Sequence, residues 1–185
     1  SSESQVKYMI NDAAIRYVFV GEQYQYDVAF RVLRMCPSLE RLIIIDKTVK
    51  KDPQDRVSIS FSDFIHLGED DRHASEIDQR SSELQRDDLA NILYTSGTTG
   101  DSKGVMLTHL MYESVLCYQD KALPLSDKDV ILNFLPFTHV FERAWSYWCI
   151  ARGATLCVNL RPTDVQQSLK EVHPTCMCSV PRFWE

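Results

Sequence analysis

The chain has 185 residues and a mass of 21.4 kDa, and its 44% hydrophobic and 25% charged residues exclude a disordered or collagen-like protein. The net charge of -6 argues against a nucleic-acid surface as its main function. No stretch is long and apolar enough to cross a bilayer. The six cysteines are scattered without a C-x-x-C pair, so we expect reduced thiols in a cytoplasmic protein.

Helical and strand patterns alternate in the first third of the chain. Residues 4–12 have a helical pattern, and residues 15–20 are β-branched and aromatic, as in a short buried strand. Residues 41–46 (RLIIID) form the strongest strand pattern, and Ser60 is placed to cap a short helix that runs to Ile65. Between the first two strands, a helix is predicted by apolar residues at helical spacing: Tyr24, Val28, Val32 and Met35.

Residues 69–88 interrupt this alternation. They contain eight acidic side chains against three arginines, a net charge of -5, and few apolar residues to bury. We therefore expect an acidic, solvated surface excursion in this window. It separates a first βαβ portion, residues 1–68, from a second portion, residues 89–185.

The alternation resumes in the second portion. Strand patterns cover residues 89–95, 130–135, 154–159 and 175–180. Three amphipathic helices lie between them, marked first by Leu107, Leu110, Met111, Val115 and Tyr118, then by Phe141, Ala144, Trp145, Trp148 and Cys149, and last by Val165, Leu169 and Val172. Gly153 is placed to end the second helix. Thr163 and Gln166 form a candidate capping box for the third, and Pro181 can open a further helix.

Near-continuous apolar strands separated by amphipathic helices predict an α/β fold, with a largely parallel, doubly wound sheet and helices on both faces. Ligands bind such sheets at the carboxyl ends of the strands. The loops to inspect therefore follow Thr95, Leu135, Asn159 and Val180.

The loop after Thr95 has the composition of a phosphate-binding loop. Residues 95–104 read TSGTTGDSKG, and the three glycines permit close backbone approach, while exposed amides form an anion-binding concavity. Lys103 adds a mobile positive charge that suits a polyphosphate. Further donors come from the hydroxyls of Thr95, Ser96, Thr98 and Thr99. The order of residues matches neither a Walker A loop nor G-x-G-x-x-G, and the alternative is a flexible linker.

The segment LYTSGTTGDSKGVMLTH, residues 93–109, resembles the phosphate-loop signature of the adenylate-forming (AMP-binding) enzyme family. Two further blocks, LPFTHVFER at 135–143 and SVPRFWE at 179–185, look most like the long-chain fatty acid–CoA ligase branch. Ser102 stands where the family usually has proline, which leaves the lysine and the glycines in register. The resemblance implies a partial N-terminal domain of the acyl-CoA synthetase type.

Members of this family activate a carboxylate with ATP to an acyl-adenylate and transfer the acyl group to coenzyme A. The resemblance therefore implies a fatty acid, ATP and coenzyme A as substrates, and Mg²⁺ as the metal. Thr95 matches the threonine that helps bind magnesium, and His139 matches the position between the acyl pocket and the adenylate. Together with Lys103 these are the implied catalytic residues. The phosphates would be held by Thr95, Ser96, Gly97, Thr98, Thr99, Gly100 and Lys103.

Three residues near His139 have two interpretations. Glu142 falls in the first turn of its predicted helix, where a carboxylate also suits the helix dipole. Trp145 and Trp148 either border a fatty-acyl tunnel or pack in the core. The sequence leaves both interpretations open.

Several blocks of the family are missing from these 185 residues. They are the Tyr-Gly-x-Thr-Glu block, the ribose-binding aspartate, the hinge and the small C-terminal domain with its lysine. We therefore expect an internal piece of the large N-terminal domain that is inactive as a ligase by itself. Its exposed sheet edges predict self-association, and peripheral membrane contact is compatible with the sequence.

Two alternative functions remain open. The chain could come from an aryl-acid–CoA ligase or a peptide-synthetase adenylation domain, which share the same motifs. It could also be a non-catalytic nucleotide- or phosphate-binding module.

Overall fold

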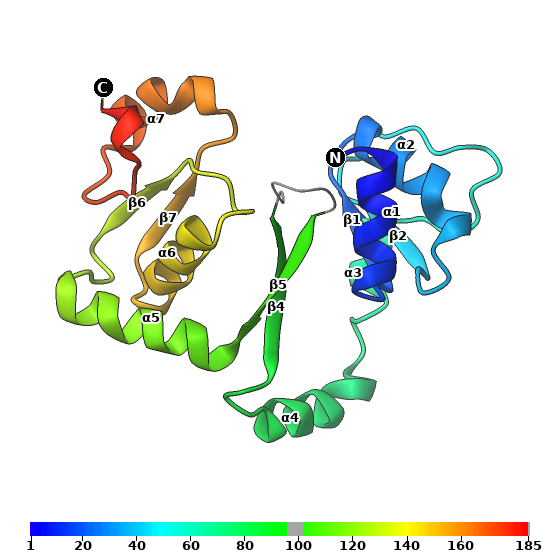
Figure 1. Ribbon diagram of the computed structural model, residues 1–185, viewed down its shortest axis with the longest axis horizontal. Coiled ribbons are helices and arrows are strands. Elements are labelled where there is room, and N and C mark those ends of the chain that lie inside the picture. The colour runs from blue at the N-terminus through cyan, green and yellow to red at the C-terminus, as the bar shows by residue number, and fades with distance from the viewer. Residues whose placement is uncertain (96–101, 185) are drawn as a thin grey trace. The chain divides into compact units, whose positions relative to one another are not determined.

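The computed structural model describes residues 1–95 and 102–184. The chain forms two compact units, which are considered separately (Figure 1). The first is built from residues 1–84, with residues 102–104 grouped with it, and the second from residues 85–95 and 105–184.

The first unit contains a three-stranded parallel sheet in the order β1-β2-β3. Its strands are β1 (Tyr17–Val20), β2 (Arg41–Ile44) and β3 (Ile59–Ser60). Its helices are α1 (Glu3–Asp12), α2 (Gln23–Val32) and α3 (Phe61–His66), with a 3-10 turn at Leu33–Met35. The Ser60 side chain accepts a hydrogen bond from the Asp63 backbone N–H, which confirms the predicted cap of α3.

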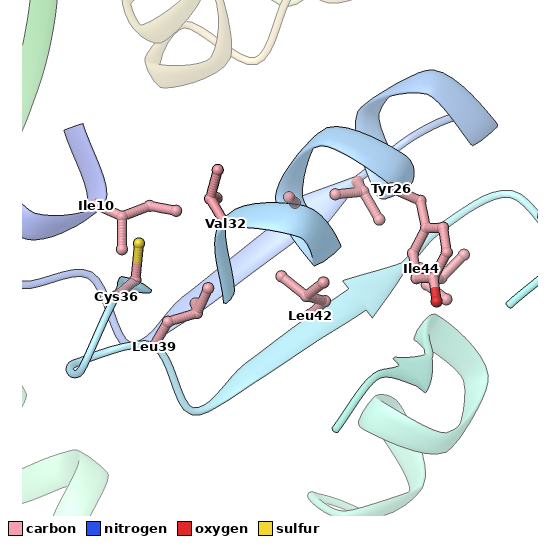
Figure 2. Packing of buried hydrophobic residues seen from close by; sticks show 9 residues of the cluster. Ile10, Tyr26, Val32, Cys36, Leu39, Leu42 and Ile44 are labelled. Carbon is pink, nitrogen blue, oxygen red and sulfur yellow. The ribbon is translucent and has the colours of Figure 1, made fainter. Parts of the chain in front are cut away.

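Helices cover both faces of this sheet, as the sequence predicts. On one face α1 and α2 pack against β1 and β2 in a core of Ile10, Val20, Tyr26, Ala29, Val32, Cys36, Leu39, Leu42 and Ile44 (Figure 2). On the other face α3 contacts β2 and β3. There the ring of Phe19 meets Phe61 and Phe64 edge-on, with centroids 6.4 and 5.4 Å apart.

The buried face of α2 differs from the predicted one. Tyr24 and Met35 are exposed, whereas Tyr26 is fully buried. The Tyr26 hydroxyl donates to Asp55 Oδ2 at 2.7 Å and accepts from the Asp52 backbone N–H at 2.9 Å. Because both hydrogen-bonding capacities of this hydroxyl are met inside the unit, the tyrosine can be buried there at little cost.

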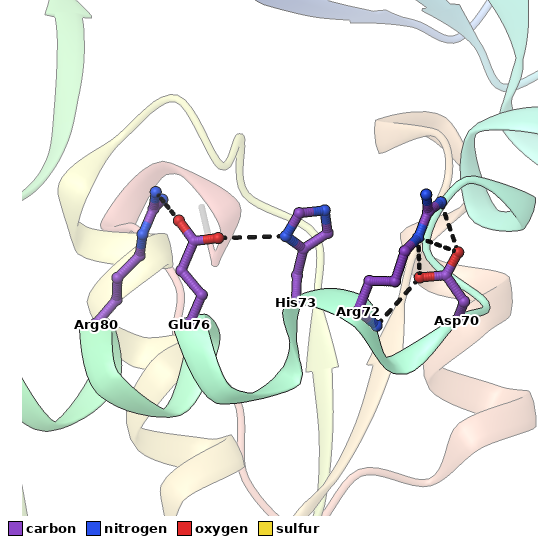
Figure 3. Close-up of polar contacts among 5 residues, drawn as sticks. All are labelled: Asp70, Arg72, His73, Glu76 and Arg80. Carbon is purple, nitrogen blue, oxygen red and sulfur yellow. Dashed lines mark hydrogen bonds and ion pairs between the residues drawn. The ribbon is translucent and has the colours of Figure 1, made fainter.

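The acidic window is exposed at every residue from 69 to 88, and it contains a 3-10 helix (Asp71–His73) and α4 (Ala74–Glu83). Figure 3 shows its short-range pairs: Arg72 with Asp70 at 2.6 Å, and Glu76 with both His73 and Arg80. Pairs three and four residues apart stabilise an exposed helix, which accounts for helical structure without a buried apolar face.

The second unit contains two pairs of strands. β4 (Leu89–Thr95) pairs with β5 (Lys103–Thr108), and β6 (Val130–Asn133) pairs in parallel with β7 (Thr155–Val158). Its helices are α5 (His109–Ala122), α6 (Val140–Ala151) and α7 (Val165–Val172), with 3-10 turns at Pro162–Asp164 and Pro181–Phe183. α6 packs on β6 and β7, and α7 contacts β6. The α/β class with parallel pairing is confirmed.

Three local predictions for this unit were wrong. Leu107 was predicted on a helix face but lies in β5, because residues 103–108 form a strand. The seven-residue connection from β4 is too short for a parallel crossover, so β4 and β5 make an antiparallel hairpin. Residues 175–180 make only one parallel bridge, from Cys176 to Ile131. Thr163 lies inside a 3-10 turn, and α7 follows Asp164 without a side-chain cap.

The core of the second unit lies between α6 and the β6–β7 pair. Its buried members are Ile131, Trp145, Trp148, Cys149 and Cys178. Gly153 follows α6 with φ at +73°, the left-handed conformation expected of a glycine after a helix. In the described parts of the chain, no helix has the length and apolar character needed to cross a membrane.

Candidate functional site

Thr95 and Lys103 flank the predicted phosphate loop. β4 ends at Thr95, its hairpin partner β5 begins at Lys103, and both side chains are exposed. The Lys103 ammonium forms no ion pair with any residue that the structure describes. The predicted phosphate-binding residues between them, Ser96, Gly97, Thr98, Thr99 and Gly100, lie outside the described residues.

Thr95 is suited to contribute to a magnesium site but does not make one alone. Its hydroxyl is a hard oxygen ligand on an exposed strand end, which is the type that Mg²⁺ prefers. Within residues 1–95 and 102–184, no group of three or more His, Cys, Asp or Glu side chains is arranged to hold a metal ion. The remaining ligands would have to come from bound phosphates, from water or from other residues.

His139 lies at the start of α6, as its N-cap residue, with an exposed side chain. Its backbone N–H donates to Pro136 O at 3.0 Å, and its carbonyl accepts from the Arg143 N–H at 3.2 Å. The Arg143 guanidinium also donates to Phe137 O at 3.1 and 2.9 Å. These bonds fix the turn between β6 and α6 and leave the imidazole facing solvent.

The structure does not join these predicted site residues in one sheet. Thr95 ends a strand of the β4–β5 pair, whereas His139 follows a strand of the β6–β7 pair. No hydrogen bond or ion pair links His139 to Thr95 or Lys103 in the described part of the chain. Their assembly into one site therefore stays a prediction.

Glu142 is a buried carboxyl group whose burial the sequence left undecided. It is only 1% exposed, on the inner face of α6. The Cys178 thiol donates to Glu142 Oε2 at 3.3 Å, and Oε1 has no partner among the described residues. Burial raises the pKa of Glu142, and the hydrogen bond from Cys178 only partly opposes this rise. The environment therefore makes the neutral acid more favourable than it is in water.

A buried polar chain also ends on the backbone carbonyl of Glu142. Asn133 Nδ2 donates to Ser146 Oγ at 2.5 Å, and Ser146 Oγ donates to the Glu142 carbonyl at 2.7 Å. Both tryptophans of α6 are buried, with ring centroids 5.2 Å apart, and pack in the core. The sequence did contain a signal for Glu142, because residues 142, 145, 146 and 149 recur at i, i+3, i+4 and i+7 on one helix face.

Residues 1–185 of the chain match the family model described as "AMP-binding enzyme". Among curated proteins, the chain is 35% identical over 134 residues to long chain acyl-CoA synthetase 3 of Arabidopsis thaliana, a match to 68% of this chain and 19% of that protein. It is 28% identical over 191 residues to long chain acyl-CoA synthetase 4 of the same organism, covering 96% of this chain. The chain spans only 27% of that second relative.

Solved structures show the same fold. The crystal structure of ATP-bound MatB from Rhodopseudomonas palustris superposes with a TM-score of 0.67 at 20% sequence identity. The match covers 100% of this chain and 33% of MatB. At this identity the similarity establishes the fold, which is that of an adenylate-forming enzyme's N-terminal domain.

Proposed function

The chain belongs to the AMP-binding enzyme family, and we propose that it is part of an enzyme that activates a long-chain fatty acid with ATP and transfers the acyl group to coenzyme A. The observation that carries this proposal is the unbroken motif at residues 93–109, between the last residues of β4 and the start of α5. The long-chain acyl-CoA synthetases among its relatives support the fatty acid as substrate.

The chemical obstacle in this reaction is the approach of two anions, the carboxylate and the triphosphate. We propose that Lys103 neutralises phosphate charge, since its exposed ammonium has no acidic partner among the described residues. The Thr95 hydroxyl would hold magnesium. That ion would supply further charge neutralisation at the phosphates.

His139 is proposed to lie where the acyl group meets the adenylate. The bonds that fix the turn before α6 would hold its imidazole in one place, which is what a positioning role at the reacting carboxylate requires. Lys103, Thr95 and His139 are thus the proposed catalytic residues of the complete site.

The chain alone is expected to be inactive, because it spans only about a quarter of the relative that it matches along nearly its whole length. Formation of palmitoyl-CoA from palmitate, ATP and coenzyme A should not exceed the rate without protein. A clear ATP-dependent rate from these 185 residues would refute this proposal.

Binding of magnesium-ATP tests the phosphate loop directly. In isothermal titration, Lys103→Ala is expected to weaken binding about tenfold, since it removes a charged hydrogen-bond donor. Lys128→Ala, an exposed lysine in the turn before β6, is the matched control and should bind as the unmodified chain does. Equal binding by the chain and its Lys103→Ala variant would contradict the role of Lys103.

A chimera tests the substrate class. The aligned segment of Arabidopsis thaliana long chain acyl-CoA synthetase 4 is replaced by this chain. We expect palmitate to support acyl-CoA formation better than benzoate, and His139→Ala to lower that activity. Preference for benzoate would favour the aryl-acid alternative, and loss of both activities with intact ATP binding would favour a non-catalytic nucleotide-binding module.

A further inference from the structure

A cavity of about 490 Å³ opens in the first unit at the carboxyl ends of β2 and β3. Two segments line it, residues 44–51 after β2 and residues 60–66 at β3 and α3. Ile44 lies at the carboxyl end of β2 (Figure 2). This end of a parallel sheet is where ligands commonly bind, and the volume is typical of small-molecule sites. We call this cavity the β2–β3 pocket.

The wall of the β2–β3 pocket is mainly apolar. Ile44, Ile45 and Val49 contribute from the segment after β2, and Phe61 and Ile65 contribute from α3. Ile45 and Ile65 are 51% and 50% exposed, so two large aliphatic side chains face solvent within one concave site. Covering them with an apolar ligand would remove that surface from water.

The charged groups of the pocket favour an anion. The Lys47 ammonium makes no hydrogen bond or ion pair with any described residue. Lys51 Nζ is anchored by the Ser58 carbonyl at 2.5 Å and keeps two further N–H donors.

The acidic groups nearby are already engaged. Asp46 Oδ1 accepts from both the backbone N–H and the hydroxyl of Thr48, each at 2.8 Å. Asp63 Oδ2 accepts from Ser60 Oγ at 2.7 Å. His66 Nδ1 contacts Glu69 Oε1 at 2.6 Å. Among the charged side chains that line the pocket, Lys47 therefore has no hydrogen-bond or ion-pair partner in the described part of the chain.

We propose that the β2–β3 pocket binds an amphipathic anion, an apolar chain with a single carboxylate or phosphate head. The chain lies against Ile45, Phe61 and Ile65, and the head pairs with Lys47 at the rim. This inference does not depend on the proposed function, because the pocket is built entirely from residues 44–66 and its test measures binding without catalysis.

The first experiment compares head groups on one apolar chain. The 185-residue chain is titrated calorimetrically with decanoate, decyl phosphate, decanol and decyltrimethylammonium, each below its micelle-forming concentration. At least one of the two anions is expected to bind with one-to-one stoichiometry, about tenfold or more tighter than decanol and the cation. The tighter of the two anions identifies the head group. Equal binding by decanol, or no binding by either anion, would overturn the proposal.

The second experiment locates the bound ligand. Lys47→Met removes the charge and keeps the apolar stem, so affinity for the tighter anion should fall about tenfold. Lys50→Met, three residues further on and outside the pocket lining, is the matched control and should leave affinity unchanged.

A bulky side chain tests the apolar part. Ile45→Trp should fill the pocket and abolish binding, whereas Leu67→Trp, at a somewhat more exposed apolar position outside the lining, should not. Far-UV circular dichroism establishes that each variant is folded. If Lys47→Met and Ile45→Trp are both folded and both bind as well as the unmodified chain, the ligand binds elsewhere and the proposal fails.

Discussion

At the scale of single residues, Tyr26 and Asp55 form a buried, hydrogen-bonded pair in the first unit. The Asp55 carboxylate accepts from the Tyr26 hydroxyl and from the backbone N–H groups of Val57 and Ser58, at 2.7 to 2.9 Å. Burial raises the pKa of Asp55, but the hydrogen bonds from Ser58, Tyr26 and Val57 outweigh it and hold this pKa below its usual value. Burial and Asp55 also raise the pKa of Tyr26 to about 12.

Tyr26→Phe should therefore destabilise the first unit by about 2 kcal/mol, because it leaves a buried Asp55 oxygen and the Asp52 N–H without a partner. A lowered folded-state pKa gives stability that is present above the ordinary carboxyl pKa and lost as the pH falls through the folded value. The variant should thus also unfold at a higher pH in acid. Hydrogen exchange of the β1 and β2 amides measures both effects. Tyr24→Phe, exposed on the same helix, should change neither.

For Glu142 the dependence of stability on pH has the opposite sign. Its folded-state pKa is raised by burial, so the folded state keeps a proton that the unfolded state releases, and stability falls as the pH rises above about 4.5 toward the folded value. Glu142→Gln is neutral and of similar shape, and should be more stable than the unmodified chain at pH 7 but not at pH 4. Tryptophan fluorescence during urea unfolding reports the second unit, because Trp145, Trp148 and Trp184 all lie there.

The control for this prediction is Glu171→Gln on α7, where the side chain is exposed. Its stability should follow the unmodified chain at both pH values. A Glu142→Gln variant with the same pH dependence as the unmodified chain would show that the buried carboxyl is already charged in the folded state.

Tyr26 and Glu142 both show a limit of prediction from residue types alone. The pattern that placed Tyr24 on the buried face of α2 weighed apolar character alone. The buried Tyr26 hydroxyl donates a hydrogen bond to Asp55, 29 positions away, and nothing local encodes that partner. The burial of Glu142 was left open by the sequence, since its hydrogen-bond donor is Cys178, 36 positions away.

At the scale of elements, helix ends offer a matched pair of tests. Gly153 after α6 has φ at +73°, and His173 after α7 has φ at +48°. A side chain in this conformation costs about 1–2 kcal/mol, although glycine also loses more freedom on folding. Gly153→Ala should therefore destabilise the second unit by about 1 kcal/mol, whereas His173→Gly should stabilise it by up to about that amount.

Urea unfolding followed by tryptophan fluorescence measures both variants in the same unit. A Cβ at Gly153 would lie 3.4 Å from Asp127 Cβ, which is an ordinary contact, so the effect isolates the backbone conformation. Changes of the same sign in both variants would contradict this explanation.

Elements with a complete local pattern were predicted well. β4 occupies residues 89–95 as expected, and α6 buries Ala144, Trp145, Trp148 and Cys149 of its predicted face, whereas Phe141 of that face is exposed. β5 was missed because its residues 103–108 have only one partner strand and remain mostly exposed, so they lack the apolar run of a buried strand. Residues 175–180 have that run but make one bridge, because pairing depends on a neighbouring strand and not on the segment alone.

At the scale of the whole molecule, the motif at 93–109 identified the family although the chain matches only 19% and 27% of the two Arabidopsis relatives. A dense phosphate-loop motif is local, so a short chain carries it intact. The assembly of a site from Thr95, Lys103 and His139 is not local, because Thr95 and Lys103 lie on the β4–β5 pair whereas His139 follows β6 of the other pair. The sequence positions of these three residues alone therefore could not predict that they lie on different strand pairs.

The open strand edges of the chain predict self-association. In the described part of the second unit, β7 pairs only with β6, and Val158 at its end is 54% exposed. Such an edge presents unpaired backbone groups to another copy, and lysine on an edge opposes that pairing. Sedimentation velocity should show a concentration-dependent increase in the average sedimentation coefficient, and Val158→Lys should reduce it. Ile150→Lys, at an exposed position on α6, should leave the association unchanged. It removes a similar apolar surface, but one that does not lie on a strand edge. If both variants associate less to the same extent, the association depends on exposed apolar surface in general and not on the β7 edge. If the unmodified chain is a monomer at all concentrations, the prediction of self-association is wrong.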